Sequence, residues 1–325
     1  MTPEIVLLMG PPASGKSTKV REFVSQGYTR LNRDELGGSM ASGGTVNQEL
    51  LKAYGAGARS FVLDNTYATK EQRASVIDIG KSLNLPVRAL VMGTTAEQAQ
   101  FFAARRQVQR HGYLLREGDY KLPKHKGDAN DFPPAAQFAY WNKKEDPTTA
   151  EGLVVVETVP VRIDLGYDYR NSAYIFDYDG TLRETISGEK YPRVHTDIRV
   201  LPGRADKLKL LKAQGHRLLG ASNQSGCSKK PGDVKYISEA DAAVCFAHTN
   251  KLLGLPGEIE VLFATDAAGV PKSFWRKPCP GMGLVFIEKY KLDPSKVTYV
   301  GDLGTDKTFA ARCGFQFALA DEFFR

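Results

Sequence analysis

Short apolar runs alternate along the chain with longer stretches whose apolar positions recur at helical spacing. This alternation is typical of βαβ units, in which helices connect the parallel strands of one sheet. In the first half of the chain, the apolar runs predict strands at residues 5–9, 28–32, 60–63, 87–92 and 153–158. A second series predicts strands at residues 173–176, 217–221, 261–264, 297–300 and 315–319. We therefore predict an α/β fold with two domains, each built on a doubly wound parallel sheet.

A polar stretch without periodicity separates the two series of strands and predicts a linker near residue 168. The predicted domains are accordingly residues 1–165 and residues 170–325.

Two local signals in the first half add detail. Thr69 and Gln72 have capping-box spacing and predict the start of a helix that continues to Leu83. The stretch at residues 105–126 is charged and ends in Pro, Gly and Asp, which predicts a mobile excursion from the sheet.

The composition is that of an ordinary globular protein. The chain has 325 residues, with 44 Lys and Arg against 37 Asp and Glu, and a formal net charge of +7. Neither half is strongly basic, so any contact with nucleic acid must come from local patches. The four cysteines form no CxxC pair, which disfavours a zinc framework and predicts a reduced, cytoplasmic protein. The first residues lack the basic start and long apolar run of a signal peptide, so we expect no membrane association.

A glycine-rich loop follows the first predicted strand and matches the pattern G-x-x-x-x-G-K-S/T, running from Gly10 to Ser17. Such a loop points its backbone N–H groups at phosphates, and the next helix adds its positive end. The pattern predicts a nucleotide site in which Lys16 contacts the β- and γ-phosphates and the Ser17 hydroxyl holds Mg²⁺. A glycine turn before an ordinary helix is the alternative. The candidate nucleotide-binding residues are Gly10, Ser14, Gly15, Lys16, Ser17 and Thr18.

Two aspartates follow the next strands of this half. Asp34 comes after the second predicted strand and Asp64 after the third. Because the carboxyl ends of neighbouring parallel strands meet at one edge, both side chains are expected to face the bound γ-phosphate. The alternatives are a structural ion pair of Asp34 with Arg33 or Arg30, and an Asx turn at Asp64.

The glycine-rich loop, the N-R-D-x-L-G stretch around Asp34 and the D-N-T stretch at Asp64 resemble the polynucleotide 5′-kinases over residues 4–160. The resemblance implies ATP as the phosphate donor and Asp34 as the base that takes the proton of a 5′-hydroxyl. It implies Arg105 as the lid arginine, with Arg106 and Arg110 as alternatives.

This chain departs from the phage member of that family, which has a further arginine where Gly37 stands here. The contact to the phosphate next to the acceptor nucleotide is therefore left open between Arg33, Arg73 and residues 105–126.

In the second half, an apolar strand runs into D-x-D-G-T at Asp177 and Asp179. Two carboxylates placed two residues apart can divide the cleavage of a phosphate ester between them. One attacks phosphorus, while the other protonates the leaving oxygen and later activates water.

Three later stretches occur in the order found in the haloacid dehalogenase phosphatases, which this half of the chain resembles. They are S-N-Q-S-G from Ser222, R-K-P-C-P-G-M with Lys277, and G-D-L-G-T-D with Asp302 and Asp306. By charge, Ser222 and Lys277 would stabilise the phosphoryl oxygens. The oxygen ligands expected for Mg²⁺ are Asp177, the Asp179 carbonyl, Asp302 and Asp306.

The same branch contains polynucleotide 3′-phosphatases, histidinol phosphatases and heptose bisphosphate phosphatases. The insertion at residues 183–200 is short, and residues 227–258 are mostly taken up by a predicted helix, so no large cap is expected. An open site suits the end of a polymer. The leading hypothesis is thus an enzyme that phosphorylates 5′-OH ends and removes 3′-phosphates from DNA or RNA. The alternative is a small-molecule kinase fused to a histidinol-phosphate or sugar-phosphate phosphatase.

Overall fold

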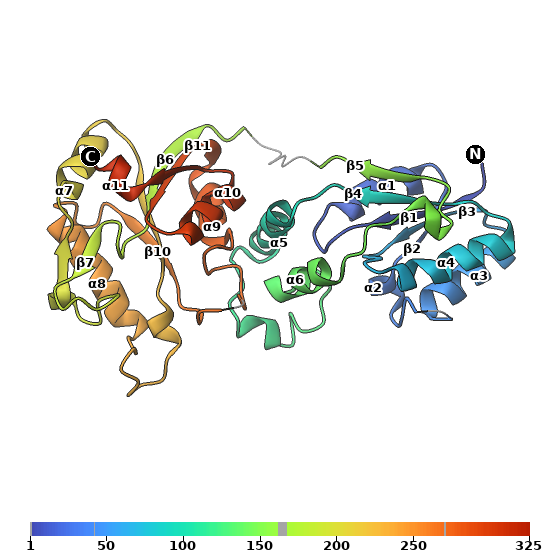
Figure 1. Ribbon diagram of the computed structural model, residues 1–325, viewed down its shortest axis with the longest axis horizontal. Helices are drawn as coiled ribbons and strands as arrows, with labels where there is room; N and C mark the ends of the chain where they lie inside the picture. The colour runs from blue at the N-terminus through green and yellow to red at the C-terminus, as the bar shows by residue number, and fades with distance from the viewer. Residues whose placement is uncertain (1, 42, 162–167, 270) are drawn as a thin grey trace. The chain divides into compact units, whose positions relative to one another are not determined.

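The computed structural model describes residues 2–41, 43–161, 168–269 and 271–325. The chain forms two compact units, Met1–Phe102 with Ala136–Asp164, and Ala103–Ala135 with Leu165–Arg325. Each unit contains a five-stranded parallel sheet (Figure 1), which confirms the predicted α/β class. Most of the predicted linker, residues 162–167, lies outside the described residues. No helix in the described ranges has the length and apolar character needed to cross a membrane.

The sheet of the first unit has the strand order β2-β3-β1-β4-β5. All five predicted strands of this half are present, and only the last begins a few residues later than predicted. Their bounds are β1 (Glu4–Met9), β2 (Thr29–Leu31), β3 (Ser60–Asp64), β4 (Val87–Met92) and β5 (Val156–Val159).

Helices pack on both faces of this sheet because β1 is apolar at every position from Ile5 to Met9. Val6 and Leu8 share a core cluster with Val20 and Phe23 of α1. Ile5, on the opposite face, shares another cluster with residues of α3 and α4. The predicted capping box is confirmed, since Thr69 Oγ1 accepts a hydrogen bond from the Gln72 amide at the start of α4. The helices begin and end as α1 (Lys16–Ser25), α2 (Arg33–Leu36), α3 (Thr45–Gly55), α4 (Lys70–Leu83), α5 (Ala96–His111) and α6 (Pro134–Lys143).

The sheet of the second unit has the order β10-β9-β6-β11-β12. It contains all five strands predicted for this half: β6 (Asn171–Phe176), β9 (Leu218–Asn223), β10 (Glu260–Ala264), β11 (Leu292–Gly301) and β12 (Gln316–Leu319). An additional antiparallel pair, β7 (Arg183–Thr185) and β8 (Ile198–Val200), occupies the short insertion after the first motif.

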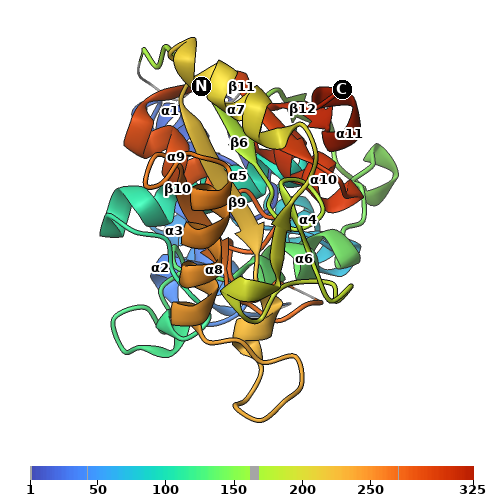
Figure 2. The ribbon, with the colours of Figure 1, turned by 90° about the vertical axis from the view of Figure 1, so that its left-hand side faces the viewer.

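The helices of this unit are divided between the two faces of its sheet. Helices α7 (Arg204–Ala213), α8 (Glu239–Leu252) and α11 (Ala320–Phe323) lie on one side, in front of the strands in Figure 2. Helices α9 (Gly281–Tyr290) and α10 (Gly304–Cys313) lie on the other side (Figure 1).

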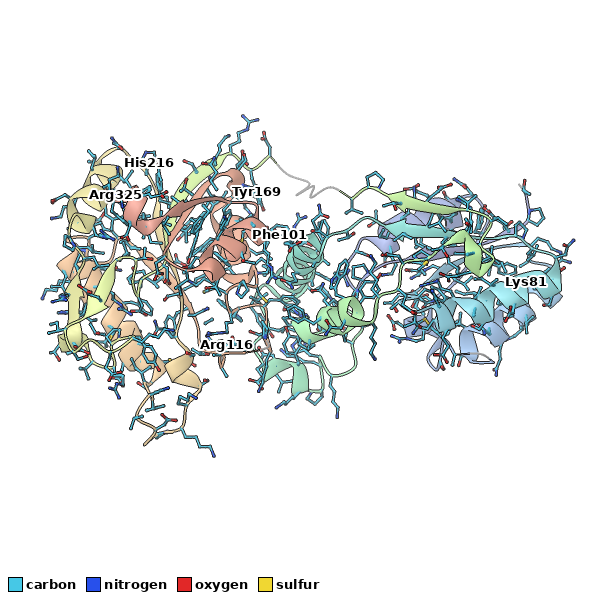
Figure 3. All side chains as sticks on the ribbon, in the orientation of Figure 1. Lys81, Phe101, Arg116, Tyr169, His216 and Arg325 are labelled. Carbon is cyan, nitrogen blue, oxygen red and sulfur yellow. The ribbon has the colours of Figure 1, made fainter. Side chains whose placement is uncertain are left out.

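The segment 103–135 packs within the second unit, although it is continuous with the helix α5 that starts in the first. The indole Nε1 of Trp275 donates to the carbonyl oxygen of Leu114 at 3.1 Å. Arg116, labelled in Figure 3, lies over the Trp275 ring and pairs with Glu239. Lys272 pairs with Glu117 at 2.8 Å. These contacts attach the segment to α8 and to the loop that precedes α9.

Candidate active sites

The glycine-rich loop lies between β1 and α1, as the pattern predicts. Gly10, Ala13 and Gly15 adopt positive φ angles, and a Cβ on Gly10 would lie 2.8 Å from Ser14 Oγ. The loop therefore folds tightly on itself before α1 begins at Lys16. Ser17 and Thr18 follow in the first turn of the helix and are exposed.

The Lys16 ammonium lies across the mouth of this loop. Its Nζ donates to the carbonyl oxygens of Gly10 at 3.0 Å and Pro11 at 2.9 Å, and lies 3.3 Å from Ser14 Oγ. These carbonyls are weaker partners than the charged oxygens of a phosphate, so the side chain is positioned to exchange them for an anion. The loop can therefore provide one fixed cation and a helix N-terminus to a phosphate chain.

The strand register places Asp64 at the same edge of the sheet as this loop. Asp64 pairs with Leu8 across the sheet, and its side chain is 2% exposed. Arg30 NH2 donates to Asp64 Oδ2 at 2.8 Å, so an ion pair holds the carboxylate. A buried carboxylate beside an anion loop is suited to bind a cation or a water that serves one.

Asp34 lies in the short helix α2, directly after β2. The Asn32 side chain caps this helix by accepting hydrogen bonds from the amides of Asp34 and Glu35. The Asp34 side chain is 43% exposed and pairs with Arg33 at 2.5 Å. The structural pairing with Arg33 is therefore present, yet it is an exposed pair that leaves the carboxylate accessible to a substrate.

The three candidate lid arginines lie on α5 and make contacts within the second unit. Arg105 Nε donates to Glu288 at 3.2 Å, and Arg106 NH1 to Asn130 at 3.0 Å. Arg110 pairs with Asp128 at 2.7 Å and with Asp131 at 2.9 Å. The choice among the three stays a prediction.

The second site gathers at the carboxyl edge of β6, β9 and β11. Asp177 follows β6 directly and is 5% exposed, and Lys277 is 3% exposed. The Lys277 Nζ donates to Asp177 Oδ1 and Asp306 Oδ1, both at 2.8 Å, and to the Tyr299 hydroxyl at 2.7 Å. Burial acts to lower the pKa of the Lys277 amine, but the two carboxylates outweigh it and raise the pKa above its ordinary value. Lys277 is therefore a fixed buried cation between two carboxylates.

Asp302 completes a group of three acids around this lysine. Ligand oxygens of Asp177, Asp302 and Asp306 lie within 4.8 Å of one another. The D-x-D-G-T turn lies so close to Asp302 that a Cβ atom on Gly180 would be 2.4 Å from Asp302 Oδ2. Three carboxylates against one ammonium leave an excess of negative charge, and oxygen ligands suit Mg²⁺. The residues present thus fit the expected cation.

Asp179 is held by two partners that the motif did not reveal. Arg183 Nε donates to Asp179 Oδ1 at 2.7 Å, and Gln224 Nε2 donates to Asp179 Oδ2 at 2.8 Å. Gln224 also reaches Ser222 Oγ at 3.5 Å, which links two of the candidate site residues. A carboxylate whose two oxygens both accept hydrogen bonds keeps one orientation.

Two family models match separate parts of the chain. One, described as an AAA domain, matches residues 5–117, and the other, described as polynucleotide kinase 3 phosphatase, matches residues 172–324. Each model covers less than half of the chain, so the two halves are similar to two different families. The resemblances drawn from the motifs are confirmed by these matches.

The three relatives described next are 15–30% identical to this chain. The bifunctional polynucleotide phosphatase/kinase of Schizosaccharomyces pombe is 30% identical over 166 residues, which cover 51% of this chain and 35% of that protein. The match thus spans about a third of that relative. A D,D-heptose 1,7-bisphosphate phosphatase from B. bronchiseptica is 22% identical, with a TM-score of 0.40, over 46% of this chain and 79% of its own. A chain of the Pnkp1/Rnl/Hen1 RNA repair complex is 15% identical, with a TM-score of 0.32, over 98% of this chain and 96% of its own.

The structure excludes one candidate for the contact to the acceptor phosphate. Arg73 is completely buried, with its guanidinium paired to both carboxylate oxygens of Glu151 at 2.7 and 2.8 Å. It also donates to the carbonyl oxygens of Tyr67 and Glu145. Arg73 therefore connects α4 to the stretch before β5 and cannot reach a substrate. Arg33, which is exposed, and the segment 105–126 stay open for that contact.

Arg73→Met is expected to lower the free energy of unfolding of the first unit by about 3–5 kcal/mol, because it strands a partly buried Glu151 carboxylate. Urea denaturation followed by circular dichroism measures the change. Arg59→Met, at an exposed arginine of the same unit, is the matched control and should change it by less than about 1 kcal/mol. Equal stabilities for the two variants would show that the buried pair contributes nothing.

Proposed function

We propose that this chain repairs the ends of nucleic acids, by phosphorylating 5′-OH ends and hydrolysing 3′-phosphate ends. The observation that supports it most is the presence of two separate phosphate-handling sites, each at the carboxyl edge of its own parallel sheet. The match of residues 172–324 to the polynucleotide kinase 3 phosphatase family supports a nucleic-acid substrate. In this proposal the kinase domain is residues 1–165 and the phosphatase domain is residues 170–325.

In the kinase reaction, the glycine-rich loop holds the phosphates of ATP and Lys16 neutralises charge on the γ-phosphoryl group. Asp34 accepts the proton of the 5′-hydroxyl as the oxygen attacks phosphorus. A lid arginine, Arg105 in our assignment, balances the charge of the transferring group. Bound Mg²⁺, held through Ser17 with Asp64 nearby, would lower the negative charge of the phosphates.

In the phosphatase reaction, an Asp177 oxygen attacks phosphorus and forms an aspartyl-phosphate. The 3′-oxygen leaves with a proton from Asp179, which then takes a proton from the water that hydrolyses the intermediate. Ser222 and Lys277 hold the phosphoryl oxygens during both steps. The ligands for Mg²⁺, which would add positive charge there, are Asp177, the Asp179 carbonyl, Asp302 and Asp306.

The runner-up remains a small-molecule kinase joined to a histidinol-phosphate or sugar-phosphate phosphatase. The basic residues of the segment 105–126 only partly support a polyanion, because Arg110 and Arg116 are paired with acids. Lys121, Lys124 and Lys126 are exposed, and the one neutral partner of Lys124, the Tyr113 hydroxyl at 2.9 Å, is weaker than a backbone phosphate would be. All four cysteines are free, which fits a reducing, cytoplasmic location.

The deciding assay uses an oligonucleotide with a 5′-OH and a 3′-phosphate, together with labelled ATP. We expect label on the 5′ end and release of phosphate from the 3′ end. Each contacted backbone phosphate should add about −0.7 to the slope of log affinity against log salt. Charge removal at Lys121, Lys124 and Lys126 together should flatten that slope for the kinase KM. Faster turnover of histidinol phosphate or a heptose bisphosphate than of any oligonucleotide would favour the runner-up.

Asp34→Asn should lower kinase kcat by about 10²–10⁴-fold while the KM for ATP stays unchanged, because only general-base catalysis is removed. Steady-state kinetics with saturating oligonucleotide measures both constants. Glu35→Gln changes the next acidic residue, which is 63% exposed and paired with Arg30, and serves as the control. A variant at Asp34 that binds ATP poorly but turns over normally would make this residue a binding group.

A further inference from the structure

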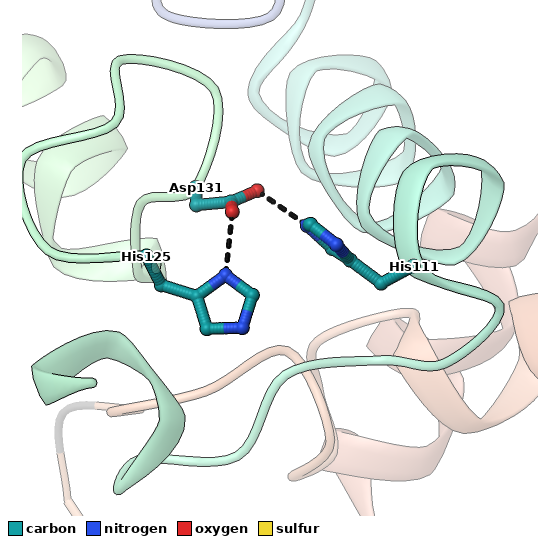
Figure 4. A group of neighbouring side chains, drawn as sticks. All are labelled: His111, His125 and Asp131. Atoms are coloured by element: carbon teal, nitrogen blue, oxygen red, sulfur yellow. Dashed lines mark hydrogen bonds and ion pairs between the residues drawn. The ribbon is translucent and has the colours of Figure 1, made fainter. Parts of the chain in front are cut away.

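A second cluster of possible metal ligands lies in the segment 103–135, apart from the carboxylates of the phosphatase site. His111 is the last residue of α5, while His125 and Asp131 lie in the irregular stretch that precedes α6. Figure 4 shows the two imidazole rings each directed at a different oxygen of the Asp131 carboxylate, and the ring centroids are 4.7 Å apart. Residues 20 positions apart in the chain thus meet at one carboxylate.

The distances are close to those that a bound metal ion requires. His111 Nε2 lies 2.9 Å from Asp131 Oδ1, and His125 Nδ1 lies 2.7 Å from Asp131 Oδ2. One ligand atom from each residue lies within 4.8 Å of the other two. Ligands held at 2.0–2.1 Å around a tetrahedral zinc ion are about 3.3 Å apart. Small side-chain rotations are enough to open the cluster to that spacing.

The surroundings keep the carboxylate charged and oriented. The Asp131 side chain is fully buried, and Arg110 NH1 donates to its Oδ1 at 2.9 Å. Arg110 is itself neutralised by Asp128 at 2.7 Å. Such outer contacts are typical of carboxylates that bind metals.

The hydrogen bonds of the cluster do not satisfy all of its polar atoms. His125 is 1% exposed, and its Nε2 is buried without a hydrogen-bond partner among the described residues. The His125 imidazole and the Asp131 carboxylate are thus taken out of water in a stretch whose regular structure, between α5 and α6, is one short 3₁₀ turn at Asp119–Lys121. Burial of polar groups in a stretch with little regular structure costs free energy that a metal–ligand bond can offset.

We infer that His111, His125 and Asp131 form a binding site for a divalent transition-metal ion of the zinc type, with water as a further ligand. Imidazole nitrogen selects zinc-like ions over Mg²⁺, which prefers oxygen alone. The ion would fix the stretch that carries Asn130 and Asp128, the partners of Arg106 and Arg110. The site goes beyond the proposed end-repair reactions and takes no part in their chemistry.

The test measures metal content and zinc affinity in the untagged full-length chain, with Mg²⁺ in excess to occupy the carboxylate site. One equivalent of zinc per chain is expected by mass spectrometry of the purified protein. Co²⁺ added after chelation should give the strong visible absorption of a tetrahedral site. The variants are His111→Gln and Asp131→Asn, and the control is His195→Gln, at an exposed histidine outside the cluster.

Both cluster variants should lose the bound equivalent and the Co²⁺ absorption, while the control keeps them. If Asp131→Asn fails to fold, His111→Gln alone decides, because His111 retains 18% side-chain exposure. A metal-free chain that takes up no zinc at micromolar concentrations would overturn the proposal, as would unchanged binding by His111→Gln. Neither outcome depends on kinase or phosphatase activity, so failure here is distinct from failure of the proposed function.

Discussion

Asp177→Asn should lower the rate of 3′-phosphate release by roughly 10⁴- to 10⁶-fold, because an amide cannot form the aspartyl-phosphate. The fold should survive the change. Lys277 keeps its contacts with Asp306 at 2.8 Å and with the Tyr299 hydroxyl at 2.7 Å, so its ammonium is not left without an acceptor. Phosphate release from a 3′-phosphorylated oligonucleotide under single-turnover conditions measures the loss.

The 5′-kinase activity of the same protein is the internal reference and should stay within about twofold of the parent, because the glycine-rich loop shares no residue with the phosphatase site. Asp206→Asn, at an exposed acid on α7, is the matched control and should leave both activities intact. Residual phosphate release within tenfold of the parent would show that Asp177 is not the nucleophile. Loss of both activities in a folded protein would show that the two sites are coupled.

Strands β1, β3 and β9 were predictable because each is a short apolar run that is buried on both faces. The antiparallel pair β7 and β8 was not, because each strand has only three residues. β7 also reverses the usual pattern, since its inward positions are Arg183 and Thr185. A buried arginine on a strand can be predicted only when the acid that pairs with it is known. Here that acid is Asp179.

The candidate sites were predictable to the extent that strand ends define them. Asp177 and Asp302 follow β6 and β11, which are neighbours in the sheet, so the topology alone brings the two acids together. Lys277 belongs to a loop, and no periodic pattern places its amine between Asp177 and Asp306. The sequence does not predict the role of a charged residue whose partner lies far away in the chain. Arg73 is the clearest case, because Glu151 lies 78 residues further along the chain.

The position of the segment 103–135 also depends on remote contacts. Its basic residues suggested a lid for the kinase, yet Leu114 accepts a hydrogen bond from Trp275, 161 residues away. A Cβ on Gly281 would lie 2.4 Å from Leu114 Cδ2, so the segment approaches α9 closely. The loop between Trp275 and Gly281 carries Lys277. The segment therefore contributes to the surroundings of Lys277, whatever its part in the proposed kinase reaction.

Lys16→Ala is expected to lower 5′-kinase activity by about 10³–10⁵-fold, the range found when a cation that contacts the transferring phosphoryl group is removed. Two losses combine in this variant. The γ-phosphate loses its fixed positive charge, and the loop loses the ammonium that joins the carbonyls of Gly10 and Pro11. Transfer of label from ATP to a 5′-OH oligonucleotide measures the activity, and a nucleotide-binding titration separates affinity from turnover.

Lys19→Ala is the matched control, since Lys19 lies one turn further along α1 and pairs with Glu22 on the surface. It should retain kinase activity within about twofold, because a surface ion pair contributes little. Phosphate release by the Lys16 variant should equal that of the parent. The Asp177 variant should behave the other way round, losing phosphate release and keeping kinase activity. Normal kinase turnover in Lys16→Ala would mean that the glycine-rich loop does not hold the donor phosphates. Loss of phosphate release alongside kinase activity would instead show that the phosphatase site depends on an occupied kinase site.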